Sequence, residues 1–483
     1  MSIRFPRPFA IAIDDLGWIN GQDDGADGYG PYRLGLDRQM TMADYEAVVN
    51  LAKRTGVRLQ GLFILGEMDR ENFLDQHPTT THMRGKWDNT ENISDLQIEM
   101  MEYVKAQSAY LEFGLHGVGH EFWPEDGKRN RAEWYNTDEH CPWPEADIRD
   151  HVACFVRLMR QYHISPEFGH SFPESFVPCA YSYHWDPYGP YSSGSILSEY
   201  GVRYANTDFT QIPESNPPLK DGGGFDHHVH VMNRYNYGNL WFEVGKTPTV
   251  PLEEQETDYI ETHWPNLLDH DPKDHSRVTE LWVDYYQKVQ QNPNRYCAKN
   301  TAQMHAQWLY NRFTKVSETE PGTVEIDNRA MPANVYKGLF PGNMVLKVAL
   351  KEGEHISEAT LDSKRIPAYF EDEGYGFLYL PQLLRAKYTL KYTIGKESLK
   401  ETVWHDNTSN ILDTSIVAEQ VKIDLVLYGR QCIRYMSSRE PAHISSNNPG
   451  IRIIEWSIHN NMLTIEAEAH DMQGETGAIS IIY

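Results

Sequence analysis

Short apolar runs alternate with segments of helical periodicity between residues 9 and 315. The runs at 9–13, 59–65, 110–115 and 202–205 have the continuous apolar character of buried strands. Helix-start signals lie between them, because Thr41 with Asp44 and Ser94 with Gln97 form the pattern of a capping box. Strands that alternate with helices in this way predict a parallel sheet or barrel.

The pattern changes near residue 320. Apolar stretches then follow one another with turn residues between them, and helical periodicity is nearly absent. We expect strands at 323–326, 344–350, 375–380, 388–394, 421–427, 451–458, 462–467 and 478–482. The chain is therefore predicted to have a first domain over 1–318 and a β-sandwich region over 319–483, with a possible division into modules 319–400 and 401–483.

Composition narrows the classes of partner. The chain has 483 residues, which favours more than one domain, and its formal net charge of −25 disfavours nucleic acid and anionic membrane surfaces. No apolar run approaches the ~18 residues of a membrane span. The apolar stretch 9–13 is too short for an export signal, and the five cysteines are scattered. We expect a soluble cytoplasmic protein; the oligomeric state is not indicated.

Two groups of polar residues directly follow predicted strands. Asp14 and Asp15 follow the first, and His116 and His120 follow the run at 110–115. With 21 histidines, about one His-x-x-x-His pair is expected by chance, so the spacing alone decides nothing. Their position matters more, because the carboxyl ends of barrel strands carry active sites. Two imidazoles and a carboxylate suit a divalent metal ion and leave a coordination position open.

Three segments together resemble the motifs of the polysaccharide deacetylases. Residues 13–17, Ile-Asp-Asp-Leu-Gly, are similar to the family motif T-F-D-D-G. Residues 116–120 are similar to H-S/T-x-x-H, and residues 260–263 are similar to L-x-x-H. The resemblance covers roughly residues 5–315 and implies the deformed (β/α) barrel of that family, here followed by all-β sandwich domains.

The resemblance also implies roles for single residues. Asp14 would be the general base, His263 the general acid, and Asp15, His116 and His120 the ligands of one divalent metal ion, with zinc the expected one. Such an ion lowers the pKa of its bound water toward ~7, so that a carboxylate can take the proton. The implied reaction removes an acyl group, expected to be N-acetyl, from a carbohydrate.

The chain departs from the family in several places. The third family motif, R-x-P, corresponds to residues 176–179, which contain no arginine. Another group must therefore orient the base, and Arg33 and Arg203 are candidates. Gly117 replaces the hydroxyl residue of the second motif. Two alternatives therefore stay open: a catalytically inactive carbohydrate-binding protein of the same fold, and a metal-dependent hydrolase of a non-sugar C–N bond.

Long polar insertions separate the predicted elements, at 21–35, 67–92, 121–145 and 213–239. Long loops in compact domains tend to be functional, and the aromatic residues in these loops could stack on sugar rings. A second group of histidines lies in the last insertion. If this segment is extended, His228 and His230 share one face and form a weaker candidate for a metal site.

Overall fold

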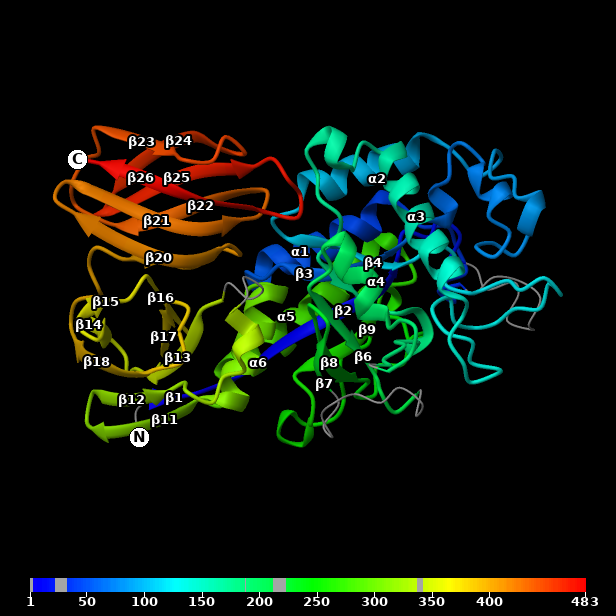
Figure 1. The fold of residues 1–483 in the computed structure, drawn as a ribbon. Helices are drawn as coiled ribbons and strands as arrows, with labels where there is room; N and C mark the ends of the chain where they lie inside the picture. The colour runs from blue at the N-terminus through cyan, green and yellow to red at the C-terminus, as the bar shows by residue number, and fades with distance from the viewer. Residues whose placement is uncertain (1–2, 22–32, 187, 212–222, 337–341) are drawn as a thin grey trace.

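The computed structural model describes residues 3–21, 33–186, 188–211, 223–336 and 342–483. Parallel strands and helices form one part of the molecule, and antiparallel sheets form the other, beside it (Figure 1). In the described ranges, none of the helices combines the length and apolar character needed to cross a membrane.

Seven parallel strands form a closed barrel. Each strand pairs with the next, and the last pairs with the first, so the predicted α/β class is confirmed. In spatial order the strands are β2 (Arg7–Leu16), β3 (Leu59–Ile64), β4 (Leu111–Gly117), β5 (Ser175–Phe176), β6 (Tyr204–Thr207), β8 (Val229–Tyr235) and β9 (Tyr259–His263). Strand β10 (Arg295–Cys297) pairs with β2, and β7 (Gly223–Asp226) pairs with β8.

Helices surround the barrel and bury their apolar faces against it. Both capping boxes are present, Thr41 with Asp44 and Ser94 with Gln97, so these helices begin where the sequence predicts. The helices are α1 (Met42–Thr55), α2 (Asp95–Ala106), α3 (Glu145–Gln161), α4 (Ser193–Tyr200), α5 (His275–Gln291) and α6 (Thr301–Phe313). Short 3-10 turns include Gly66–Met68, Cys179–Tyr181 and Trp264–Leu267.

Strand β8 lies inside the segment 213–239, which the sequence analysis predicts to be a polar insertion. That prediction is wrong for residues 223–226, which form β7, and for residues 229–235. Two polar residues of β8 are buried: His230 is 0% exposed and Arg234 is 1% exposed. They point into the polar interior of the barrel, so burial of β8 does not show as an apolar run. Residues 22–32 and 212–222 of the predicted insertions lie outside the described residues.

The second part consists of three sheets, antiparallel except for the parallel pairing of Ala368–Asp372 with Val403–Trp404, and all eight strands predicted there are present. One sheet has β11 (Lys315–Glu320), β12 (Thr323–Asp327), β18 (Lys387–Gly395), β14 (His355–Leu361) and β15 (Lys364–Arg365). Another has β20 (Asn410–Val417), β21 (Gln420–Leu427), β26 (Glu475–Ile482) and β23 (His443–Ser446). The third has β1 (Ile3–Arg4), β13 (Met344–Ala349), β17 (Tyr375–Leu380), β16 (Ala368–Asp372), β19 (Val403–Trp404), β22 (Arg430–Met436), β25 (Met462–Ala469) and β24 (Ile451–His459).

The eight-stranded sheet connects the parts of the chain. It runs through both predicted modules, because β16 pairs with β19, and it includes β1 from the start of the chain. From β1 in this sheet, β2 leads into the barrel (Figure 1). The chain therefore connects the barrel to the sheets twice, before the first barrel strand and after the last barrel helix.

The sheets contact the barrel at the amino ends of its strands. Arg58, directly before β3, donates to the carbonyl oxygen of Met472 at 3.0 Å. Thr408 donates to the carbonyl oxygen of Ala109, near the start of β4, at 2.5 Å. The carboxyl ends of the strands, where Asp14 and His116 lie, are at the other end of the barrel.

Candidate active site

The carboxyl ends of strands β2, β4, β8 and β9 meet around one cavity of about 190 Å³. Asp14, His116, Arg234 and His263 line it, one from each strand. This is the end of a parallel barrel where catalytic groups are usually found. The residues that the sequence analysis selected, far apart in the chain, are therefore brought together.

Asp14 and Asp15 both reach the same imidazole. His263 Nε2 lies 3.9 Å from an oxygen of Asp14 and 3.9 Å from an oxygen of Asp15. Neighbours on a regular strand would point to opposite faces. The pairing of β2 with β3 shifts register between Ile13 and Leu16, and Asp15 has φ of 71°. This irregularity at the strand end turns both carboxylates toward the site.

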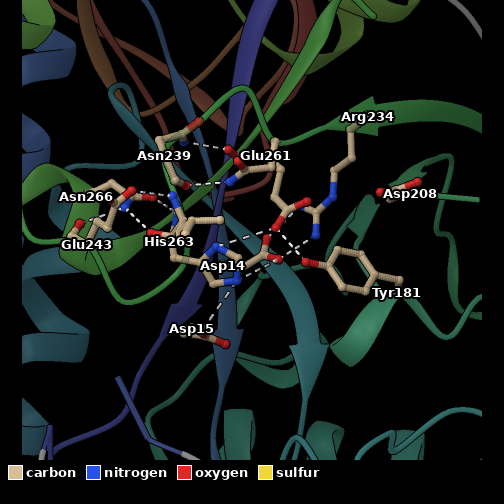
Figure 2. A network of polar contacts seen from close by, with 12 residues as sticks. Asp14, Asp15, Tyr181, Asp208, Arg234, Asn239, Glu243, Glu261, His263 and Asn266 are labelled. Carbon is tan, nitrogen blue, oxygen red and sulfur yellow. Dashed lines mark hydrogen bonds and ion pairs between the residues drawn. The ribbon is translucent and has the colours of Figure 1, made fainter. Parts of the chain in front are cut away.

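Arg234 holds Asp14 in place. Its two terminal nitrogens donate to the two carboxylate oxygens at 2.8 and 2.5 Å, and both side chains are almost fully buried (Figure 2). Burial alone would raise the pKa of Asp14, but the charge and hydrogen bonds of Arg234 outweigh it and lower that pKa to about 2. Asp14 is therefore ionised and fixed in orientation at neutral pH.

Arg234 corrects the sequence analysis, which considered Arg33 and Arg203 for this role. Arg33 lies 2.6 Å from Glu67, and Arg203 lies 2.9 Å from Glu174, so each pairs with a carboxylate other than Asp14. The sequence signal for Arg234 was its place in the alternating segment Val-His-Val-Met-Asn-Arg-Tyr. The alternation predicts a buried strand only if the barrel interior can accept polar side chains such as Arg234.

His116 is oriented by the main chain. Its Nδ1 donates to the carbonyl oxygen of Val177 at 2.7 Å, which directs Nε2 toward Asp15 Oδ1 at 3.3 Å. A backbone acceptor on one ring nitrogen is typical of a metal-ligating histidine. Burial alone would lower the pKa of His116, but the carboxylates of Asp14 and Asp15 raise it. Burial lowers the pKa of His120 to about 3, which keeps this ring neutral and able to bind a metal.

The structure brings together part of the donor set that was predicted for a divalent ion. Zinc ligands at 2.0–2.2 Å in tetrahedral geometry lie about 3.4 Å apart, close to the separation of Asp15 Oδ1 and His116 Nε2. Asp15 Oδ1 is buried and has no hydrogen bond of normal geometry from the described residues. Donor atoms of His116, His120 and Cys179 lie within 4.8 Å of one another. Asp15, His116 and His120 thus remain the predicted ligands.

Cys179 is an additional candidate that the sequence analysis did not select. Its thiol donates to the carbonyl oxygen of His116 at 3.2 Å. Burial and the nearby carboxylates, Glu133 foremost, raise the pKa of this thiol well above its usual value. A bound divalent ion would deprotonate a coordinating thiol, so Cys179 is a further candidate ligand beside Asp15.

Glu133 holds the loop between the two histidines. Its carboxylate accepts hydrogen bonds from the backbone N–H groups of Val118 at 2.9 Å, Gly119 at 3.2 Å and His120 at 3.0 Å. It also lies 2.9 Å from His151 Nδ1. A side chain on Gly117 would overlap this carboxylate. Glycine at this position therefore follows from packing, because the loop is held by Glu133 and not by a hydroxyl residue.

His263 ends β9 and is fixed from both sides. Its backbone N–H donates to Asn266 Oδ1 at 2.8 Å, while Nδ1 lies 3.8 Å from Glu261 Oε1. Tyr181 donates to the same Glu261 oxygen at 2.6 Å (Figure 2). The ring is buried to 7% exposure and faces the carboxylates of Asp14 and Asp15. This position allows proton exchange with a group bound in the cavity.

The insertion at 121–145 contributes to the cavity wall, as expected of a functional loop. Glu121, Arg129 and Arg131 line the cavity together with Trp241, which follows β8. The second group of histidines lies elsewhere: His228 is exposed, whereas His230 is buried with its Nδ1 2.8 Å from Nδ1 of His305. The two side chains do not share one face, which removes the reason for a metal site there.

The resemblance to the polysaccharide deacetylases rests only on the motif segments 13–17, 116–120 and 260–263. No family model matches the chain, and a search of curated proteins finds no similar sequence.

Proposed function

We propose that this protein is a metal-dependent hydrolase that removes an acyl group, N-acetyl above all, from a carbohydrate. The observation that carries the proposal is the buried pair of Asp14 and Arg234, beside both a set of metal-ligand side chains and His263 in one cavity. Base, acid and metal donors are the parts that hydrolysis of an acyl group requires.

Asp14 is the general base. Because its pKa is about 2, it is a weak base but is fully ionised, and its orientation costs nothing at the moment of reaction. Asp15, His116 and His120 would hold the ion, which supplies Lewis acidity to polarise an acyl carbonyl and to make water more acidic. His263, whose Nε2 lies 3.9 Å from Asp14, is placed to donate a proton to the leaving nitrogen or oxygen.

Arg234 also bears on the alternative of an inactive binding protein. That alternative rested on the missing arginine of the third motif, and Arg234 supplies the guanidinium that orients Asp14. The aromatic rings of Tyr181 and Trp241 in the cavity support a sugar substrate, since aromatic faces pack well against sugar rings.

The test combines metal content with release of acetate from acetylated sugars. Wild-type protein incubated with zinc should bind about one equivalent, and His116→Ala should lose it. Asp14→Asn and His263→Ala should keep the metal but lower kcat by about 10²-fold to 10⁴-fold. His228→Ala changes an exposed histidine outside the cavity and serves as the matched control.

Two results would contradict the proposal. One is wild-type protein that binds no divalent ion. The other is acetate release that persists at the wild-type rate in both Asp14→Asn and His263→Ala. Hydrolysis of simple amides at the expense of acetylated sugars would redirect the proposal to a non-sugar substrate.

A further inference from the structure

Two arginines enter the candidate active site from one insertion. Arg129 and Arg131 line the cavity with His116, His120 and Asp14, although the chain as a whole carries a formal net charge of −25. An acidic surface repels anions. Cationic side chains at the cavity that holds the proposed catalytic groups therefore indicate that this cavity binds a negatively charged ligand.

Hydrogen bonds hold the main chain that carries these arginines. Asn130, between them, is buried to 2% exposure and exchanges backbone hydrogen bonds with Phe122 at 3.1 and 3.0 Å. Its side chain donates to Asn136 Oδ1 at 3.1 Å. Two residues after Arg131, Glu133 binds the loop of the metal-ligand histidines. The arginines are thus positioned relative to the same loop that would hold the metal.

The residues that line the cavity carry more positive than negative charge. Asp14 is neutralised by Arg234, and Glu121 is the other carboxylate that lines the cavity, against the two arginines Arg129 and Arg131. Arg131 is exposed and forms no ion pair with an acidic side chain in the part of the chain that the structure describes. A divalent ion at Asp15, His116 and His120 would add further positive charge. A bound anion would therefore be stabilised by charge-assisted hydrogen bonds that a neutral sugar cannot make.

We propose that the substrate is an acidic acylated sugar, and that Arg131 binds its carboxylate or phosphate group. This inference rests on the proposed function for the acyl group, but the anion site itself is independent of turnover. Arginine is suited to it because its planar group binds two oxygens of a carboxylate or phosphate at once.

The test measures binding by titration calorimetry to the zinc-loaded full chain. The probes are N-acetylglucosamine, N-acetylglucosamine 6-phosphate and N-acetylmuramic acid, which present no anion, a phosphate and a carboxylate. We expect at least one acidic probe to bind at least about tenfold more tightly than the neutral sugar. Arg131→Gln should remove this difference, and Arg131→Lys should restore part of it. Comparison of the two acidic probes identifies the preferred anion.

Arg157→Gln is the matched control, because Arg157 is a half-exposed arginine on α3 outside the cavity, and it should retain the preference. Equal binding of acidic and neutral probes, no binding of either acidic probe, or an unchanged preference in Arg131→Gln would overturn the inference. Tight binding that depends on Arg131 without acetate release would support the anion site and contradict the proposed function. If wild type and Arg131→Gln hydrolyse neutral and acidic probes equally well, the proposed function would be supported and the anion site contradicted.

Discussion

Asp14 and Arg234 form a buried ion pair between strands whose residues are 220 positions apart in the chain. Loss of one member leaves an uncompensated charge in the interior, which is costly because no water can solvate it. The pair therefore couples stability to the orientation of the proposed base, and the two effects can be separated by mutation.

Arg234→Met should lower the free energy of unfolding by about 3–5 kcal/mol, since Asp14 would remain buried without its partner. The double variant Asp14→Asn with Arg234→Met should recover a large part of that loss, because no unpaired charge remains, yet acetate release should stay low. Urea unfolding and acetate assays check both results. A double variant no more stable than Arg234→Met would argue against the charge pair as the cause.

The pH dependence of stability follows from the lowered pKa of Asp14. The carboxyl group has a pKa of about 2 in the folded protein and roughly 3.9 when unfolded. Its contribution is therefore present above about pH 4 and is lost as the pH falls toward 2. Urea unfolding of wild type and Asp14→Asn should show a difference in stability that is constant at neutral pH and changes below pH 4. A stability difference between the two proteins that stays constant down to pH 2.5 would contradict the lowered pKa of Asp14.

At the scale of elements, the loop after β4 depends on a carboxylate from the following insertion. Glu133 accepts backbone hydrogen bonds from Val118, Gly119 and His120, so one side chain sets the path of the whole loop. Such residues behind metal ligands act by orienting them.

Glu133→Ala should weaken zinc affinity by about 10-fold to 100-fold, because His120 would lose its fixed position. Glu139→Ala, which changes an exposed carboxylate on the same insertion, should leave the affinity unchanged. Competition with a chromogenic chelator measures both. Wild-type affinity in a folded Glu133→Ala protein would show that the loop is held by other contacts.

At the scale of the whole molecule, the β-sheets support the barrel from the end opposite the cavity. Arg58 is buried there, with Nη1 3.2 Å from Glu112, Nη2 donating to Met472 and its guanidinium 4.2 Å from the Tyr428 ring centre. Because β1 also joins the sheet of β13, neither part is complete without the other. We expect both parts to unfold together.

Arg58→Met should destabilise the molecule by about 3 kcal/mol, since Glu112 would lose its buried partner. It should keep one calorimetric transition and leave kcat per folded molecule unchanged, because Arg58 lies far from the cavity. Lys53→Met, on the solvent-facing part of α1, is the control. Two separate transitions in wild type would show that the parts are independent.

Local sequence was sufficient for most elements. The capping boxes at Thr41 and Ser94 predict the starts of α1 and α2, and alternation predicts the strands of the second part, because caps and side-chain periodicity are local properties. Asp14, Asp15, His116 and His120 were selected because they follow strands, and the carboxyl ends of parallel strands meet, whereas His263 was selected from a motif resemblance. Strand β8 was not predicted, because its polar residues face a polar barrel interior and it therefore lacks an apolar run.

By itself, the sequence determined the order of strands and helices, the change to an all-β region and the residues that could carry chemistry. Only the tertiary structure decided that the barrel closes between β2 and β9, that Arg234 is the partner of Asp14, and that Arg129 and Arg131 reach the same cavity. The physical reason is that pairing across 220 residues depends on how strands are arranged in space, and no periodicity along the chain records that arrangement.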